Sequence, residues 1–374
     1  MSNLSKYKQV NWIDGMKVNK NHFIDQENYF TARINDINDN YLDNNNYGLL
    51  PHKGDSNRFL NINTIIDNQN SLRVMINSCH AITFGGFRIE ISKEEAEQGD
   101  FILPNVEATY DLASANDEDL FIIIAVDPFA RIPDGKADPD EYPLRQPFVN
   151  PQYSLHLMQA EQLDNSKLGS NMLVVGKIAI NNSKPEIDES YIPPCSSVDS
   201  HSKLIDFHTY IDQNISALEK NAVKIIYDIN EKRETNILTD IVTCIADNLL
   251  HFTSANITRV RWFLKSKAPI YLVEFVVSLA RVLKNAFDIR TAEEKEVLLN
   301  YFSEHFNIVP SRFKQLLDNT IVLNYDHTDI YHSVEKAEDF LNVISLLFNE
   351  LSKMELIAGQ KKKVEPKKID IILR

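Results

Sequence analysis

A long apolar seam in the second half of the chain constrains the fold most. Apolar residues recur there at intervals of three and four, which places them on one stripe of an α-helix and approximates a heptad repeat. The seam residues are Leu204, Phe207, Ile211, Ile215, Leu218, Ala222, Ile225 and Ile229. We predict a helix over about residues 202–230 that buries this stripe, either in a bundle or between copies of the chain.

Further helices are predicted after this one. Apolar stripes at helical spacing indicate helices over about residues 234–265, 269–287, 292–306, 311–321 and 329–354. Pro269 suits the first turn of its helix, and Leu341, Ile344 and Phe348 belong to the stripe of the last one. The pattern therefore predicts a helical domain over residues 191–357, with an inserted helical segment at about 288–327.

The chain before residue 190 has a different pattern. After a predicted helix at about residues 19–41, short β-rich runs alternate with turn residues such as Gly85-Gly86. The runs cover residues 59–62, 71–76, 87–91, 120–126 and 172–180. Residues 120–126 are apolar throughout, which is typical of a central strand covered on both faces. The fold class is therefore α+β, with a β-rich domain over residues 1–190 that we predict to be a sandwich or jelly roll.

Six prolines interrupt this domain between residues 127 and 151. Proline lacks a backbone N–H and fixes φ, so we predict that this stretch stays out of the sheet ladders. Long loops in compact domains are usually functional or disordered. A docking loop and a plain solvated loop both remain open.

Charge and composition exclude several classes of function. The formal net charge is −14, which opposes phosphate backbones, so we expect no nucleic-acid partner. Only 10 of 374 residues are glycine, and neither GxGxxG nor GxxxxGK[ST] occurs, which disfavours a nucleotide cofactor. No run of 18 apolar residues exists, and the first ten residues lack an apolar signal core. We therefore expect a cytoplasmic protein.

The sequence indicates no catalytic or metal-ligating cluster. His327 and His332 are five residues apart, whereas a helical zinc pair needs a spacing of four. Three widely separated cysteines, Cys79, Cys195 and Cys244, are interpreted as reduced thiols. We expect no cofactor, no metal and no small-molecule substrate, and hence no enzyme.

Two terminal segments are candidates for partner contact. The opening segment, predicted as a short strand at residues 10–18 with a turn at Asp14-Gly15, gathers Trp12, Gly15, Met16, His22 and Phe23. It is either a lid packed on the sandwich or a partner-binding edge. The last segment, residues 358–374, has five lysines within residues 361–368. It is either a solvated tail or a contact for anionic lipid or an acidic partner surface.

Five motifs, in order along residues 10–350, resemble the TssK family of type VI secretion baseplate subunits. They are Trp12-Ile13-Asp14-Gly15-Met16 with His22-Phe23 and Gln26; Tyr47-Gly48-Leu49; Tyr191-Ile192-Pro193-Pro194-Cys195; Pro269 to Phe287; and Tyr325-Asp326-His327-Thr328-Asp329. The spacing departs from the family at Gln26, which does not directly follow Phe23. Abundant asparagine and isoleucine suggest the divergent subtype of type VI secretion system that resembles those of Bacteroidota.

The resemblance implies an architecture, partners and site residues. A β shell similar to the shoulder of phage receptor-binding proteins would bind the TssF and TssG wedge proteins, through Trp12, Gly15, Met16, His22 and Phe23. A helical neck would follow, and the chain would form homotrimers that join the wedge to the membrane complex at the cytoplasmic face of the inner membrane. The residues expected in trimer and neck packing are Leu204, Phe207, Ile211, Ile215, Leu218, Ile225, Leu341, Ile344 and Phe348.

The sequence departs from the family after the last predicted helix. The family continues there into a head domain that docks the membrane complex, whereas here only the basic tail over residues 358–374 follows. We expect that the head is absent and that the insertion or the tail takes over its contact. Two rival functions stay open: a phage receptor-binding or tail-adaptor protein with the same shell, and an enzyme on a jelly-roll scaffold.

Overall fold

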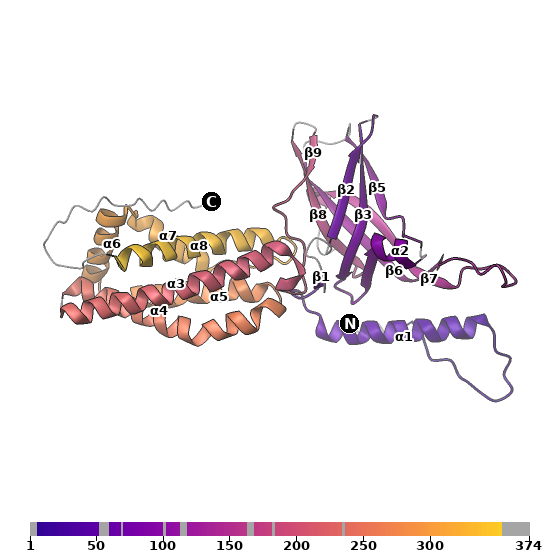
Figure 1. Cartoon of the computed structure of the whole chain (residues 1–374), viewed down its shortest axis with the longest axis horizontal. Coiled ribbons are helices and arrows are strands. Elements are labelled where there is room, and N and C mark those ends of the chain that lie inside the picture. The colour runs from indigo at the N-terminus through magenta and orange to yellow at the C-terminus, as the bar shows by residue number, and fades with distance from the viewer. Residues whose placement is uncertain are drawn as a thin grey trace. The chain divides into compact units, whose positions relative to one another are not determined.

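The structure is a computed structural model that describes residues 6–51, 60–68, 70–99, 102–112, 118–162, 168–181, 184–233 and 236–353. Contacts divide the chain into two units, Met1–His201 and Ser202–Arg374 (Figure 1). Whereas we expected the division near residue 190, the segment at 191–201 belongs to unit 1. The reason is backbone pairing, because Leu49 N donates to Pro194 O over 2.8 Å and Ser196 N donates to Leu49 O over 2.9 Å.

Unit 1 contains two antiparallel sheets (Figure 1). In the first, the long strand β3 (Ser71–Ile82) pairs with β1 (Gly48–Leu49), β2 (Leu60–Ile66), β4 (Arg88–Ser92) and β5 (Glu107–Asp111). The second has the order β7-β6-β8-β9, with β6 at Leu120–Asp134, β7 at Phe148–Gln159, β8 at Met172–Asn181 and β9 at Lys184–Ile187. Helix α2 (Lys93–Gly99) follows β4, and short 3-10 helices lie at Ala160–Gln162 and Val198–Ser200.

The two sheets pack face to face, which confirms the predicted sandwich. Alternate residues of β3 are buried, as a strand with one covered face requires. The first part of β6 is buried on both faces, and on one of them Ile123 packs in a cluster with Val174 and Tyr191. A Cβ at Gly176 in β8 would lie 2.9 Å from Cδ1 of Ile62 in β2, so the sheets approach closely there. Tyr153 of β7 also exchanges two 3.2 Å hydrogen bonds with the backbone of Glu90 in β4.

Two local predictions in unit 1 were wrong. The proline-rich stretch joins the ladder, since β6 continues through Pro133 to Asp134 and Pro133 pairs with Val149. Beyond Ala125, β6 pairs with β7 and no longer with β8, so a proline can turn its donor-less edge away from the ladder. A register shift between Asp127 and Ile132 accommodates the bend. The opening segment, in turn, contains the turn at residues 14–15 but no strand over residues 10–18.

Unit 2 is helical throughout the part that the structure describes (Figure 1). Its long helices are α3 (Ser202–Lys232), α4 (Ile237–Trp262), α5 (Ile270–Asp288) and α8 (Ile330–Leu351), and a 3-10 turn lies at Leu264–Ser266. Helix α3 packs on α4 and α8, while α5 packs on α4 and α8. The shorter helices α6 (Ala292–Phe306) and α7 (Pro310–Ile321) lie where two short helices were predicted, in the segment that we interpret from the sequence as an insertion and call the insertion. No helix in the described ranges is both long enough and apolar enough to cross a membrane.

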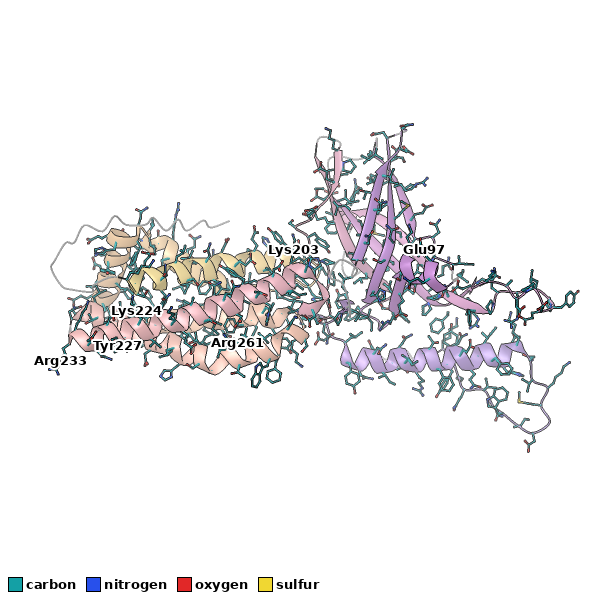
Figure 2. All side chains as sticks on the ribbon, viewed as in Figure 1. Glu97, Lys203, Lys224, Tyr227, Arg233 and Arg261 are labelled. Carbon is teal, nitrogen blue, oxygen red and sulfur yellow. The ribbon has the colours of Figure 1, made fainter. Side chains whose placement is uncertain are left out.

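The predicted seam lies inside this bundle. The nine residues named for trimer and neck packing are each at most 2% exposed within one chain. Their partners are the neighbouring helices of the same unit, because α3 lies against α4 and α8. The outer faces are mostly polar, with a few exposed apolar side chains such as Val223 and Trp262, and Figure 2 labels Lys224, Tyr227 and Arg261 among the exposed side chains of α3 and α4. In this conformation, therefore, the seam stabilises the bundle and is not available to another copy.

The inserted helices pack into the bundle through aromatic side chains. The ring centroid of Phe313 in α7 lies 6.4 Å from that of Phe287 in α5 and 5.5 Å from that of Phe302 in α6. Phe302, Phe306 and Phe313 are all buried. The insertion is consequently part of the core of unit 2, and its removal would expose Phe287.

A polar hollow of about 520 Å³ lies between α3 and α8, and Glu338 is one of its lining residues. Partial burial, together with the neighbouring charges of Asp339 and Glu335, raises the pKa of Glu338. An acid with a raised folded-state pKa loses stability as the pH rises through its unfolded-state pKa. We expect Glu338→Gln to raise the melting temperature at pH 7, by less than about 2 °C because the residue is exposed to solvent. The gain should vanish near pH 4, and thermal scans at both pH values, with Glu296→Gln at an exposed position as the control, check this.

Candidate interaction surface

The opening segment forms an exposed turn at the start of unit 1. Gly15 has a φ of +78°, which favours glycine, and the amide of Met16 donates to the carbonyl of Ile13 over 3.3 Å. A Cβ at Gly15 would find no described atom within 4 Å, so the turn projects into open space. Met16, directly after it, is half-buried. Such a turn is accessible to a partner, which a lid packed on the sandwich would not be.

Trp12 fastens this segment to the first turns of helix α1 (Lys20–Tyr41). Its indole N–H donates to Oε1 of Gln26 over 3.2 Å. The Trp12 ring centroid lies 6.0 Å from that of His22, edge to face, and 6.3 Å from that of Phe23. The structure thus brings together three of the five residues predicted for partner binding, and Gly15 and Met16 form the adjacent turn.

Helix α1 begins with a reciprocal cap. Oδ1 of Asn19 accepts from the amide of Asn21 over 2.9 Å, and Nδ1 of His22 accepts from the amide of Asn19 over 3.3 Å. His22 therefore has a structural role at the cap as well as a place beside Trp12. The helix bounds agree with the prediction for residues 19–41.

Contacts between residues that are distant in sequence extend the surface to residues 129–131 of β6. The rings of Tyr7 and Phe129 stack with their centroids 4.4 Å apart. Arg131 of β6 forms an ion pair with Glu27 of α1. Sequence reasoning missed both contacts, because residues more than one hundred positions apart give no local signal.

Helix α1 presents its polar face to the sandwich and its apolar face outward. Nδ2 of Asn38 donates to the carbonyl of Gly86 over 3.0 Å, and a Cβ at Gly86 would lie 2.8 Å from Cβ of Asn38. All residues of α1 are described, and among them only Ala32 has a buried side chain. The side chains of the outer stripe are exposed by 52–79%; they are Phe23, Phe30, Ile34, Ile37 and Tyr41. A surface helix normally does the reverse.

Comparison with known proteins adds a fold to this geometry. No family model matches the sequence, and no curated protein matches it. A crystal structure of TssK matches with a TM-score of 0.51 and 14% identity, covering 94% of this chain and 71% of that chain. The chain has the TssK fold.

A second match comes from a structure described as the type VI secretion system TssK-TssF-TssG baseplate subcomplex, determined by cryo-electron microscopy. Its TM-score is 0.51 at 13% identity, and the match covers 93% of this chain and 100% of that chain. The two comparisons confirm the fold implied by the sequence motifs, a β domain followed by helices. At 13–14% identity, these matches show that the chain shares the fold of TssK.

Proposed function

We propose that this protein is a structural subunit of a type VI secretion baseplate, which acts by holding other proteins together. The TssK fold along 93–94% of the chain is the observation that carries the proposal. In this role the protein forms a homotrimer, and it connects the TssF and TssG wedge proteins to the membrane-anchoring complex. The outward apolar surface of unit 1 supports an adhesive role, because soluble proteins rarely leave such surfaces uncovered.

The wedge-binding site in this proposal is the turn and the aromatic cluster beside it. Trp12 is 45% exposed and Phe23 is 57% exposed, although both rings touch other side chains. Partly packed aromatic residues bind well, because they bring large area at a low cost in conformational entropy. Gly15, Met16 and His22 complete the site by holding the turn and the helix start in place.

Binding of the cognate TssF–TssG complex to the purified chain tests this function directly. We expect Trp12→Ala to weaken binding by about tenfold or more, as for an aromatic anchor at an interface. Trp262→Ala is the matched control, because the second tryptophan of the chain is also exposed but lies in unit 2. Isothermal titration calorimetry measures both. If the wild-type chain does not bind, the function is wrong, whereas equal affinities for all three proteins would displace only the site.

The membrane complex would contact the insertion or the basic tail. Deleting α6 and α7 would disturb the core of unit 2, so exposed residues of α6 are better probes. Glu293 and Glu296 are exposed, and their replacement by lysine reverses the local charge without touching the core. Residues 358–374 lie outside the described part of the chain and can be removed separately. Unchanged capture of the membrane complex by both variants would contradict this assignment.

A further inference from the structure

The outer stripe of α1 has the spacing of a helix-to-helix seam. Phe23, Phe30 and Ile37 follow one another at seven-residue intervals. Ile34 lies four residues after Phe30, and Tyr41 lies four residues after Ile37. These are the d and a positions of a heptad repeat, which on an isolated surface helix calls for a second helix. We propose that the part of this stripe from Phe30 to Tyr41 binds the α1 helix of another copy of the chain.

The charges along the outer stripe favour a second copy of the same chain as the partner. The protein carries a net charge of −14, so most of its surfaces repel another copy. The positions that flank the seam are uncharged except for Arg33, which forms an ion pair with Asp36 on the same helix. Glu27 occupies an a position, but its carboxylate is paired with Arg131 of β6. Two or three α1 helices can therefore approach without like-charge repulsion.

The size of the stripe fits a real interface. Its five large side chains are each more than half exposed, and Tyr41 is 79% exposed. The largest apolar patch on a typical monomeric protein measures roughly 300–600 Å² and is often functional, so a contiguous row of half-exposed aromatic and isoleucine side chains is typical of a protein contact. The polar face of the helix is already committed, because Asn38 holds Gly86. The stripe is thus rigidly presented and needs no rearrangement to meet its partner.

This inference rests on the homotrimer of the proposed function and assigns its contact to unit 1. The heptad seam of α3, which the sequence favoured for that role, is buried within one chain. In the assembly the α1 helices would meet along Phe30, Ile34, Ile37 and Tyr41. The Trp12 cluster, at the other end of the helix, stays free for a different partner.

The oligomeric state of the full chain tests the inference. We expect the double variant Ile34→Lys, Ile37→Lys to weaken self-association by on the order of a hundredfold, because each lysine would be buried in an apolar contact. Both positions are more than half exposed in the single chain, so the variant should fold and keep the circular dichroism spectrum of the wild type. Asp25→Lys is the control, since Asp25 is exposed on the face of α1 away from the stripe. Sedimentation velocity over a concentration series measures all three.

Disulfide capture provides the second measurement. In a Cys244→Ser background, mild oxidation should link copies of the Ile37→Cys chain but not copies of the Asp25→Cys chain. The remaining cysteines should stay silent, because Cys79 and Cys195 are buried, and burial raises the pKa of Cys79 to about 12. A wild-type chain that stays monomeric, or a double-lysine variant that assembles like the wild type, would overturn the inference. A monomeric wild-type chain would also remove the homotrimer from the proposed function, whereas failure of wedge binding would remove the baseplate role itself, so the two failures can be told apart.

Discussion

Replacing Leu218 with aspartate is expected to unfold the helical unit at temperatures where the wild-type chain is folded. Leu218 is 1% exposed on α3, which packs against α4 and α8. A carboxylate placed there would lack a partner and would lose the apolar contacts of the leucine. We expect a loss of about 4 kcal/mol or more in the free energy of unfolding, a large share of the stability of a domain. Thermal unfolding followed by far-ultraviolet circular dichroism measures it.

Val223→Asp is the matched control on the same helix. Val223 is 50% exposed, so the same substitution should change the free energy of unfolding by no more than about 0.5 kcal/mol. A seam between copies would give a different result, because Leu218→Asp would then yield a folded but unassembled chain. Equal melting of the two variants would show that α3 is placed wrongly.

Replacing Gly48 with alanine is expected to disrupt the end of the sandwich. Gly48 has a φ of +110°, and a Cβ there would lie 2.0 Å from O of Pro194 and 2.2 Å from its carbonyl carbon. These neighbours are backbone atoms, and they are held by the hydrogen bond from Leu49 N to Pro194 O. We therefore expect a loss of more than about 3 kcal/mol and loss of amide protection in β1. Urea unfolding and hydrogen exchange measure these two effects.

Gly15→Ala separates backbone strain from collision. Gly15 also has a positive φ, of +78°, but nothing described lies within 4 Å of a Cβ there. The cost should be only the conformational one of about 1–2 kcal/mol. A Gly48→Ala chain no less stable than the Gly15→Ala chain would mean that the Pro194 segment does not press on β1.

Periodicity explains which parts of this fold were predictable. The helix starting at Pro269 and the buried strand at residues 120–126 were both expected, because each repeats its apolar residues with the period of its own structure. Helix α6 was predicted for the same reason, and it is observed over the predicted residues 292–306. Local chemistry also placed the turn at Gly15, where a positive φ is required.

Direction and distance explain what was missed. The spacing of Phe30, Ile34 and Ile37 shows that a stripe exists, but it does not say whether the stripe faces the core or the solvent. Contacts such as Tyr7 with Phe129 depend on the assembled fold and leave no mark in either segment. Pro133 misled the prediction because a proline is tolerated on an edge, and edges are known only once the sheet order is known.

The pairing of β1 with the segment around Cys195 has a mechanical consequence. The chain leaves unit 1 for unit 2 directly after this pairing, where Leu49 and Cys195 form a parallel bridge. If unit 2 were pulled along the backbone, the force would reach the hydrogen bonds of this pairing before it reached β3. It would load these hydrogen bonds together, in shear. Bonds loaded together resist force better than bonds opened one after another. The junction would therefore act as a clamp that keeps the sandwich intact when its neighbours are dragged apart.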